Sequence, residues 1–514
     1  MATFVAAIAL LSFLLCLFFG LRQARSGAGQ LPPSPPGLPL LGNLLQLSSL
    51  PHRSLHSLSK RYGPIFLLHL GAAPTAVLSS AELAEQVMKT LDPDFASRPP
   101  LSIADRLLYN SSGIAFSAYS EPWRQRKKTC VLHLLSSKRV QSFRWLREEE
   151  VKHLISEIRS SSPAPVNLSE KIVCLTSDVI CRAAMGRKFD EESMFRKTMK
   201  EVMTLLGMFS VADFVPWLWW VDKLSGLDGR VRRAAEVLDE ELSRVLQERM
   251  GRRRSEERMG RRRSEGGRRG EENEESADFI DVLLSLKERE EDVGSSFTLG
   301  MGSVKDIFLG GADTSFTVLI WAMAELIWHP SLMKDVQDEI RSIVGSKEII
   351  TEEDINKLTL LKVVIKETLR LHIPGPLLVP RVASQSTQIH GYNIPKGTRV
   401  IINAWAIAKD PKHWDRPEEF WPQRFTNSNI DFRGQSFELI PFGAGRRLCP
   451  GISFGVALME CALANLLYHF NWEVPEEMRE EILDMTESPG ITVQKKSPLI
   501  LIAKPYDSSL GPII

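Results

Sequence analysis

The spacing of apolar residues predicts a chain that is mostly helical, with a few short strands. In "RVRRAAEVLDEELSRVLQERM" apolar residues from Val231 to Leu238 recur at helical spacing, with charged residues between them. The segment "DFIDVLLSLKE" and the long apolar run Ser303–Trp328 extend the helical pattern. Short runs such as "IFLLHLG", "TAVLSS" and "GYNIPKGTRVIINAWAI" are typical of strands.

A further amphipathic helix is predicted in "TEEDINKLTLLKVVIKETLRLH". Thr351 is placed to cap it, and Leu361, Val364 and Ile365 share one face. Since helical segments outnumber strands, the pattern predicts a mainly α fold with a small β portion.

The N-terminus carries an uncharged run from Phe4 to Leu21, which as a helix would span about 27 Å. Arg22 and Arg25 follow it and no Lys or Arg precedes it, which places the rest of the chain on the cytosolic side. A cleaved signal peptide is the alternative, but its charges should precede the apolar run. We therefore predict a membrane anchor at 1–21, a basic and proline-rich hinge at 22–37, and one catalytic domain at 38–514.

The nine-residue unit "ERMGRRRSE" occurs at 248–256 and again at 257–265, followed by "GGRRGEENEES". No apolar face exists in this segment, so it has nothing to bury. We predict a flexible charged loop at 250–276. Nearby glutamates offset most of its arginines, which argues against a nucleic-acid partner.

Composition narrows the function classes only slightly. The chain has 514 residues, 25% charged and 43% hydrophobic, with a formal net charge of +1, so its charge favours no polyanionic partner. Its six cysteines form no CxxC pair and no dense framework, so zinc fingers and a disulfide scaffold are unlikely and a reducing compartment is indicated.

One cysteine, Cys449, lies in the loop "PFGAGRRLCPG" before a long apolar helix pattern. Pro450 is favoured at the first helical position, so the thiol sits where a helix dipole favours an anionic sulfur. Gly443 and Gly445 let backbone approach something flat and close, and Arg446 or Arg447 can bind a carboxylate. These features indicate a site for haem iron. A nucleophilic thiol, which would need a histidine base, and a structural cysteine are the alternatives.

The loop matches FxxGxRxCxG, the cysteine signature of the cytochrome P450 family, at Phe442, Gly445, Arg447, Cys449 and Gly451. The chain therefore resembles that family. The resemblance implies the cytochrome P450 fold, with haem b held between a long distal helix and the helix after the cysteine loop. It assigns Cys449 as the axial ligand of the haem iron.

The family's distal helix carries (A/G)Gx(D/E)T(T/S), which "GGADTS" matches at 310–315. The resemblance implies that Thr314 holds a water or the iron-bound oxygen and that Asp313 helps to relay protons. The alternative is that both side chains are satisfied by the helix backbone. The preceding text "FTLGMGSVKDIF" is shorter than the family pattern, and Gly300 and Gly302 weaken a helix there. Either the helix starts late, or folding or activity is impaired.

Other matches give binding and structural roles by resemblance. Glu367 and Arg370 of "ETLR" and Arg424 of "PQRF" correspond to the family's structural triad. The family's WxxxR helix, whose Trp and Arg hold the haem propionates, matches "WRQRKK" imperfectly. Trp123 is present, and either Lys127 substitutes for the arginine or Arg126 reaches from the adjacent register. Arg381 of "LLVPR" is a further propionate candidate.

"PPSPPG" and "FASRPP" are similar to plant endoplasmic-reticulum members of the large plant-specific clan. Substrate-facing segments by resemblance are 98–116, 203–220, 308–318, 374–381 and 487–492. They suggest a greasy pocket for terpenoid, phenylpropanoid or amino-acid-derived molecules. "DFVPWLWW" either dips into the membrane or belongs to the core.

The resemblance implies a membrane-anchored haem-thiolate monooxygenase that inserts one oxygen atom from O2 into an apolar small molecule. It implies a place in the endoplasmic-reticulum membrane, single-pass, with the catalytic domain in the cytosol. No GxGxxG unit suits NADPH or flavin, so electrons are expected from NADPH through a separate flavoprotein, the NADPH-cytochrome reductase. The alternatives are a haem-thiolate dehydratase or isomerase that does not use O2, and a non-catalytic haem-binding protein.

Overall fold

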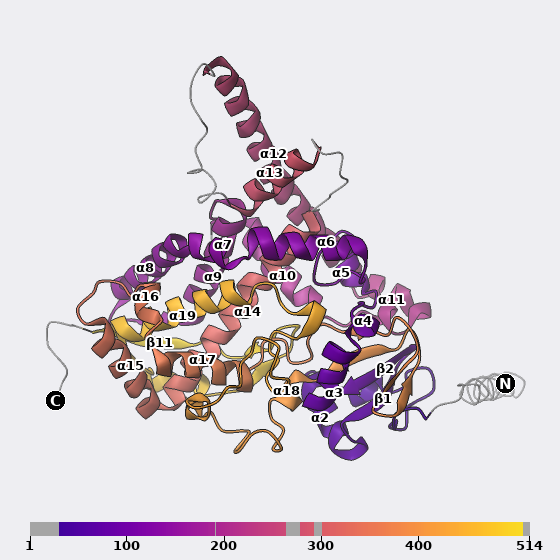
Figure 1. Ribbon diagram of the computed structural model, residues 1–514. Coiled ribbons are helices and arrows are strands. Elements are labelled where there is room, and N and C mark those ends of the chain that lie inside the picture. The colour runs from indigo at the N-terminus through magenta and orange to yellow at the C-terminus, as the bar shows by residue number, and fades with distance from the viewer. Residues whose placement is uncertain (1–29, 191, 264–277, 292–300, 507–514) are drawn as a thin grey trace, which may run out of the picture.

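The computed structural model describes residues 30–190, 192–263, 278–291 and 301–506, and it is mainly helical with small sheets (Figure 1). The mainly α fold class is therefore confirmed. The helices are α2 (Pro51–Tyr62), α3 (Ala81–Glu85), α4 (Asp92–Phe95), α5 (Ser102–Leu107), α6 (Glu121–Thr129), α7 (Ser137–Ser142), α8 (Arg144–Ser161), α9 (Leu168–Met185), α10 (Met194–Leu206), α11 (Trp219–Leu224), α12 (Leu227–Arg263), α13 (Phe279–Glu291), α14 (Met301–Trp328), α15 (Pro330–Val344), α16 (Glu352–Ile355), α17 (Thr359–Leu371), α18 (Ala404–Ile407), α19 (Ile452–His469) and α20 (Arg479–Ile482).

The strands form small sheets rather than one large one. They are β1 (Ile65–Leu70), β2 (Ala73–Leu78), β3 (Pro165–Asn167), β4 (Arg381–Val382), β5 (Thr387–Ile389), β6 (Tyr392–Ile394), β7 (Arg399–Ile402), β8 (Phe470–Glu473), β9 (Glu487–Ser488), β10 (Gln494–Lys495) and β11 (Ile500–Pro505). The largest sheet has the order β1-β2-β7-β4, and only the β2–β7 pair is parallel. Arg381, on β4, therefore lies in the same sheet as β1, which begins more than 300 residues earlier at Ile65.

Helix α14 runs through the middle of the helical part and packs against α9 and α19 (Figure 1). Its sequence is apolar almost all round, as expected of a helix buried on every side. By length and composition, two helical segments of the described ranges could cross a membrane, Ser303–Trp328 and Ile452–His469, or three if the bent pair Met194–Asp213 and Pro216–Leu224 forms one span. In the fold, 61% and 78% of the apolar windows of the first two are buried.

The entry to this helix was expected to be short. Helix α14 begins at Met301 and includes Gly302, while Gly300 lies outside the described residues. The apolar run predicted from Ser303 to Trp328 is therefore helical throughout.

Helix α12 differs from the prediction for the repeated segment. It continues through Arg263 and rises away from the rest of the fold, with the start of α13 tied to it by the Arg249–Asp278 ion pair of 2.6 Å (Figure 1). The charged loop predicted from residue 250 is therefore wrong for 250–263, and 264–276 lies outside the described residues. The reason is that Arg, Glu and Met are good helix formers, and lengthening a helix is far easier than nucleating one.

Two further expectations concern helix boundaries. The single helix predicted from Thr351 is two helices, α16 and α17, because the chain turns between Ile355 and Thr359. Thr351 does cap the first of them, in a capping box with Asp354. The predicted face is buried in α17, including Leu361 and Val364.

The predicted anchor at 1–21 and the first part of the hinge lie outside the described residues. From residue 30 the proline-rich segment lies against the sheet. The carbonyl oxygen of Pro33 accepts a hydrogen bond from the Leu67 N–H at 2.8 Å, and Pro32 and Pro35 are buried. The end of the predicted hinge, residues 30–37, is thus docked on the fold.

Candidate functional site

A cavity of about 350 Å³ lies between helix α14 and the cysteine loop. Thr314 on α14 and Cys449 both line it, although 135 positions separate them in the sequence. The other predicted residues on its wall are Phe442, Gly451, Trp123, Lys127, Arg381 and Arg447. Asp313, Gly445, Arg126 and the predicted triad are not among the lining residues.

The cysteine loop is closed by its own backbone. The Cys449 N–H donates to the carbonyl oxygen of Phe442 at 3.1 Å, and a 3₁₀ turn, η8 (Gly445–Arg447), lies between them. Helix α19 begins at Ile452, not at Pro450, so the predicted helix start is wrong by two residues. Pro450 and Gly451 form a turn that leads into the helix.

The Cys449 thiol is open to the cavity and otherwise enclosed by protein. Burial raises its pKa because an ionised sulfur would lose its water. The Gly451 N–H, which bonds to the sulfur, and the Lys127 ammonium act in the opposite direction. A thiol in this setting becomes a thiolate when a metal ion binds it, since coordination supplies the missing positive charge.

The two glycines of the loop have different roles. Gly445 has a φ of +67°, and a Cβ there would lie 2.0 Å from the carbonyl oxygen of Met88, so this glycine is required for packing against the α3–α4 segment. Gly443, with a φ of +69°, lines the cavity, and the nearest atom to a Cβ there is 3.9 Å away. Gly443 therefore leaves room on the cavity side for a flat group.

Four cationic side chains converge on the cavity: Arg98, Lys127, Arg381 and Arg447. Among the residues that the structure describes, Asp92 is the one carboxylate within ion-pair distance of any of them, 3.0 Å from Arg381. Burying several cations with so little opposite charge is costly unless an anion joins them. Burial and Arg381 lower the pKa of Arg447 to about 9, which reflects that cost. The cluster is suited to a ligand with two carboxylates.

Arg447 and Trp123 form one unit at this edge. The Arg447 guanidinium lies 4.0 Å from the centre of the Trp123 ring and donates to the carbonyl oxygens of Ala96, Ile114 and Ser117. The Trp123 Nε1–H donates to the Ile114 carbonyl oxygen at 2.9 Å. Arginine stacked on an aromatic ring is held in one orientation, which suits carboxylate recognition.

Of the two basic residues proposed after Trp123, Lys127 lines the cavity and Arg126 does not. The Lys127 Nζ donates to the carbonyl oxygens of Leu448, at 2.9 Å, and Arg446. Burial and the nearby Arg447 lower the pKa of Lys127 to about 8. The Nε atom of Arg126 is buried and has no hydrogen-bond partner among the described residues.

Arg98 of "FASRPP" lies in the predicted substrate-facing segment 98–116, but sequence reasoning missed its place among the cations at the cavity edge. Its Nε donates to the Ala115 carbonyl oxygen at 3.0 Å, and its Nη1 donates to the carbonyl oxygens of Val379 and Pro380. Burial, with Arg381 and Arg447 nearby, lowers its pKa well below the usual range. A lone arginine between a helix and a proline pair carries no local signal for this role.

Asp306 is a second missed residue on the cavity wall. Its Oδ2 accepts hydrogen bonds from the backbone N–H groups of Ile114 and Ala115, the latter at 2.8 Å. Burial raises its pKa to about 6, although these hydrogen bonds and Arg126 oppose the shift. The carbonyl oxygens of the same two residues accept from Trp123, Arg447 and Arg98. Asp306 therefore fixes a loop that holds three side chains of the cationic edge.

On the distal side the motif residues point in different directions. The Thr314 hydroxyl lines the cavity and donates to the Gly310 carbonyl oxygen at 2.7 Å. Gly310 has open space beside it, whereas a Cβ at Gly311 would lie 2.8 Å from Ile180. Asp313 turns away from the wall and accepts from Thr492 and from Gln494, the latter at 2.7 Å.

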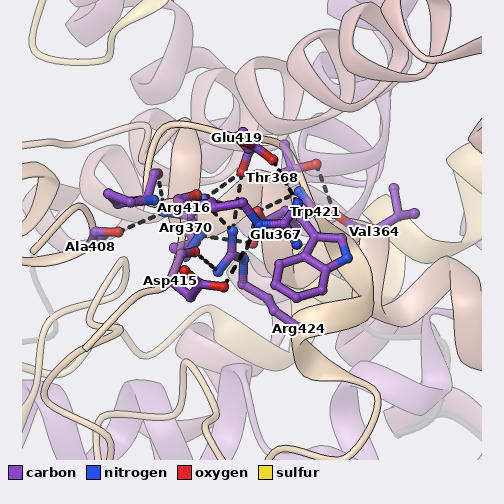
Figure 2. Close-up of polar contacts among 11 residues, drawn as sticks. Val364, Glu367, Thr368, Arg370, Ala408, Asp415, Arg416, Glu419, Trp421 and Arg424 are labelled. Atoms are coloured by element: carbon purple, nitrogen blue, oxygen red, sulfur yellow. Dashed lines mark hydrogen bonds and ion pairs between the residues drawn. The ribbon is translucent and has the colours of Figure 1, made fainter. Parts of the chain in front are cut away.

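The predicted triad lies outside the cavity. Glu367 forms two bonds of 2.8 Å with Arg370 and one of 3.1 Å with Arg424, and Arg370 also donates to the carbonyl oxygens of Ala408, Pro417 and Glu419 (Figure 2). Glu367 and Arg370 are fully buried. Because every charge here is paired and hydrogen-bonded, the arrangement is stable in spite of its burial.

Each of the five segments expected to face the substrate contributes to the cavity wall. Apolar side chains predominate there, among them Phe116, Met203, Leu309, Val379 and Ile491. "DFVPWLWW" is divided: Trp217 and Trp219 are 49% and 55% exposed, so they do not belong to the core.

The residues fit a haem. They supply a thiol for iron, a flat open surface at Gly443, and cations for two carboxylates. A cavity of this volume with a mostly apolar wall is also typical of small-molecule sites.

Several known proteins are similar to this chain over most of its length. The family model described as Cytochrome P450 matches residues 32–502. The chain is 45% identical to Cytochrome P450 736A117 of Prunus mume, over 97% of this chain and 95% of that one. It is 45% identical to phenylacetaldehyde oxime monooxygenase of Prunus mume, over 93% and 89%. A zebrafish cytochrome P450 structure with abiraterone has a TM-score of 0.70 at 27% identity, covering 89% of this chain and all of that one.

Proposed function

The chain belongs to the cytochrome P450 family, of the plant type, and from this premise we propose how its residues carry out the reaction. It is a haem-thiolate monooxygenase that uses haem b. It acts on a small molecule with O2, and the comparisons do not favour a dehydratase, an isomerase or a non-catalytic protein.

We propose that the Cys449 sulfur would bind the haem iron and that Thr314 would face the same cavity from α14. The observation that carries this is their presence on the wall of one cavity, with cations on its edge. When bound, the haem iron binds and activates dioxygen. Thr314 holds a water or an oxygen atom beside the substrate, and the apolar wall excludes bulk water.

The proposed propionate partners are Arg98, Arg381, Arg447 and Lys127, with Trp123 orienting Arg447. Support comes from their convergence with so little opposite charge. Phe442 and Gly451 pack beside the sulfur and Gly445 shapes the loop from outside the cavity. We do not propose a propionate contact for Arg126, because Lys127 and not Arg126 lies on the cavity wall.

The proposed electron source is NADPH, through a separate NADPH-cytochrome reductase with its flavins. Arg446 lies in the cysteine loop, and its side chain is 46% exposed and 3.4 Å from Asp92; an acidic partner would meet the protein at this loop.

Membrane association is supported by the likeness to plant relatives of this type. We propose the single-pass form, anchored by residues 1–21 in the endoplasmic-reticulum membrane with the catalytic domain, 38–514, in the cytosol. The exposed Trp217, Trp219, Trp220 and Leu224 form an apolar surface on and before α11. Aromatic side chains of this kind favour a membrane interface.

The proposed substrate is an apolar small molecule of plant specialised metabolism. The wall residues and the likeness to a phenylacetaldehyde oxime monooxygenase support this class. Terpenoid, phenylpropanoid and amino-acid-derived compounds all belong in the panel to be screened.

The test is the carbon monoxide spectrum of the reduced, haem-loaded protein, with and without the proposed ligand. We expect a thiolate-type Soret band that is lost in Cys449→Ser and kept in Cys174→Ser. The wild-type protein with reductase should then consume NADPH and add oxygen to at least one compound of the panel. A band that survives in Cys449→Ser would refute the ligand assignment.

A further inference from the structure

The carboxylate of Asp313 is held by the C-terminal part of the chain and not by the cavity. Its Oδ2 accepts a hydrogen bond from the Thr492 hydroxyl, and its Oδ1 accepts one of 2.7 Å from the Gln494 amide. Both oxygens are therefore engaged, and Asp313 is not a lining residue. The residue as a whole is partly buried.

Thr492 lies between Asp313 and the cavity. It lines the cavity, and its hydroxyl bonds to Asp313. The next residue fixes its position: the Val493 N–H donates to the Pro374 carbonyl oxygen at 2.8 Å, and the Val493 carbonyl oxygen accepts from Trp321 Nε1 at 3.1 Å. Thr492 is thus a rigid hydroxyl between a carboxyl group and the cavity.

The charge state of Asp313 can change at this position. Burial raises its pKa, while the hydrogen bonds from Thr492 and Gln494 oppose the rise. In the described part of the chain no cationic side chain lies within ion-pair distance of its carboxylate. Without a fixed positive partner, no nearby charge holds this carboxyl group in its ionised form.

Among the described residues, Thr314 forms no hydrogen bond with Asp313. Its hydroxyl donates to the Gly310 carbonyl oxygen at 2.7 Å, and both carboxylate oxygens of Asp313 are occupied by other donors. Thr492, and not Thr314, is therefore the residue that contacts both Asp313 and the cavity.

We propose that Thr492 is a proton-relay residue that connects Asp313 to the cavity, an inference that rests on the proposed monooxygenase function. The Asp313 carboxyl group gives its proton to the Thr492 oxygen while the hydroxyl proton of Thr492 passes to an acceptor in the cavity. Asp313 is left as a carboxylate and Thr492 stays neutral. A proton from solvent then restores the carboxyl group, and the hydroxyl again donates to it.

The reaction itself consumes these protons, since the second oxygen atom of O2 leaves as water. The electrons come from the reductase, so the relay needs no further reactant. The relay requires a hydroxyl group that can both donate and accept a hydrogen bond. Threonine and serine have such a group, and valine does not.

The test compares Thr492→Val, which keeps the shape but removes the hydroxyl, with Thr492→Ser, which keeps it. The matched control is Thr486→Val, because Thr486 makes an equivalent hydrogen bond of 2.7 Å to Asp484 at the exposed surface of the same segment. The haem-loaded proteins are supplied with reductase, NADPH and O2 without added substrate. The rate of NADPH consumption and the share of electrons recovered as hydrogen peroxide are measured in H2O and D2O.

We expect Thr492→Val to slow NADPH consumption at least about tenfold and to enlarge the solvent isotope effect, because proton transfer becomes limiting. Thr492→Ser should stay within about twofold of the wild type, and Thr486→Val should be unchanged. Wild-type rates and isotope effects in Thr492→Val would overturn the relay.

Infrared spectroscopy supplies a readout that does not depend on turnover. The C=O band of the protonated Asp313 carboxyl group, identified by its loss in Asp313→Asn, should shift in Thr492→Val and not in Thr486→Val. An unshifted band would overturn the contact. The carbon monoxide band must persist in each variant; its absence from the wild-type protein would refute the monooxygenase function itself, whereas a relay failure leaves that band intact.

Discussion

The ammonium group of Lys127 donates a hydrogen bond to the carbonyl oxygen of Leu448 over 2.9 Å. A second bond runs to the Arg446 carbonyl oxygen, and Lys127 Nζ lies 5.6 Å from the Trp123 ring centre. Helix α6 is therefore tied to the residue that precedes Cys449. One side chain supports the loop geometry and also adds positive charge at the cavity edge.

Replacing Lys127 by methionine should weaken haem retention. Two carbonyl oxygens lose their donor and the edge loses one charge, so we expect haem transfer to apomyoglobin to become about tenfold faster. Lys127→Arg, which keeps the charge and the donors, should retain haem at least as well as the wild type. The exposed neighbour variant Lys128→Met is the control. Equal transfer rates in Lys127→Met and Lys128→Met would contradict the assignment.

Asp306→Ala should loosen the loop at Ile114 and Ala115. Two buried N–H groups would lose their acceptor, at a cost of about 1–3 kcal/mol each. We expect faster haem loss and a lower midpoint of denaturant unfolding of the haem-loaded protein. Asp222→Ala is the matched control, because Asp222 also accepts two backbone N–H bonds, from Val211 and Ala212, away from the cavity. Equal haem loss in the two variants would show that the loop does not hold the edge.

Gly445→Ala should prevent the cysteine loop from packing. The position needs a left-handed φ of +67°, and the new Cβ would meet the Met88 carbonyl oxygen at 2.0 Å. Strain and overlap together should cost more than about 2 kcal/mol in the free energy of unfolding. Gly391→Ala is the comparison, because that glycine also has a positive φ, +81°, but has open space around it. Calorimetric melting of both variants measures the difference.

His469 should make stability depend on pH. Burial and Arg159 lower its pKa to about 4, and Arg159 donates to its Nδ1 at 3.3 Å. Below its ordinary value of 6.5 the unfolded chain binds a proton that the folded protein does not. The free energy of unfolding should therefore fall as the pH drops from about 6.5 to about 4, by at most about 3 kcal/mol and by about 2 kcal/mol after solvent screening.

Denaturant midpoints measured across that pH range check this expectation. His469→Gln should flatten the pH dependence, while the exposed His153→Gln should leave it as in the wild type. An unchanged slope in His469→Gln would assign the pH dependence to other groups.

The parts of the site that are contiguous in sequence could be predicted. The loop from Phe442 to Gly451 carries its glycines, arginine and cysteine within ten residues, and the distal motif lies inside one apolar helix. Local composition sufficed for the main elements, such as β1, β2 and α14, because each is a mostly apolar run.

The parts that depend on distant contacts could not be predicted. Arg98 and Asp306 act through a loop at Ile114 and Ala115, and no local pattern distinguishes them from surface charges. The direction of Asp313 depends on Thr492, 179 positions later. Helix α12 was missed beyond residue 250 because an apolar face was treated as a requirement for helix, which it is not in an extension of an existing helix.

The Glu367–Arg370–Arg424 cluster holds a stretch of chain that has little regular structure, from Ala408 to Glu419, mainly through its backbone carbonyl groups (Figure 2). Removing one charged side chain of the cluster would leave its partners buried and unpaired. The whole stretch from Ala408 to Glu419 would then lose its attachment to the cluster. Alleles altered here would then be recognised by cellular quality control as misfolded chains. A plant with such an allele would lack the protein rather than contain a slow enzyme. An immunoblot measured together with the metabolite profile would distinguish absence of the protein from low activity.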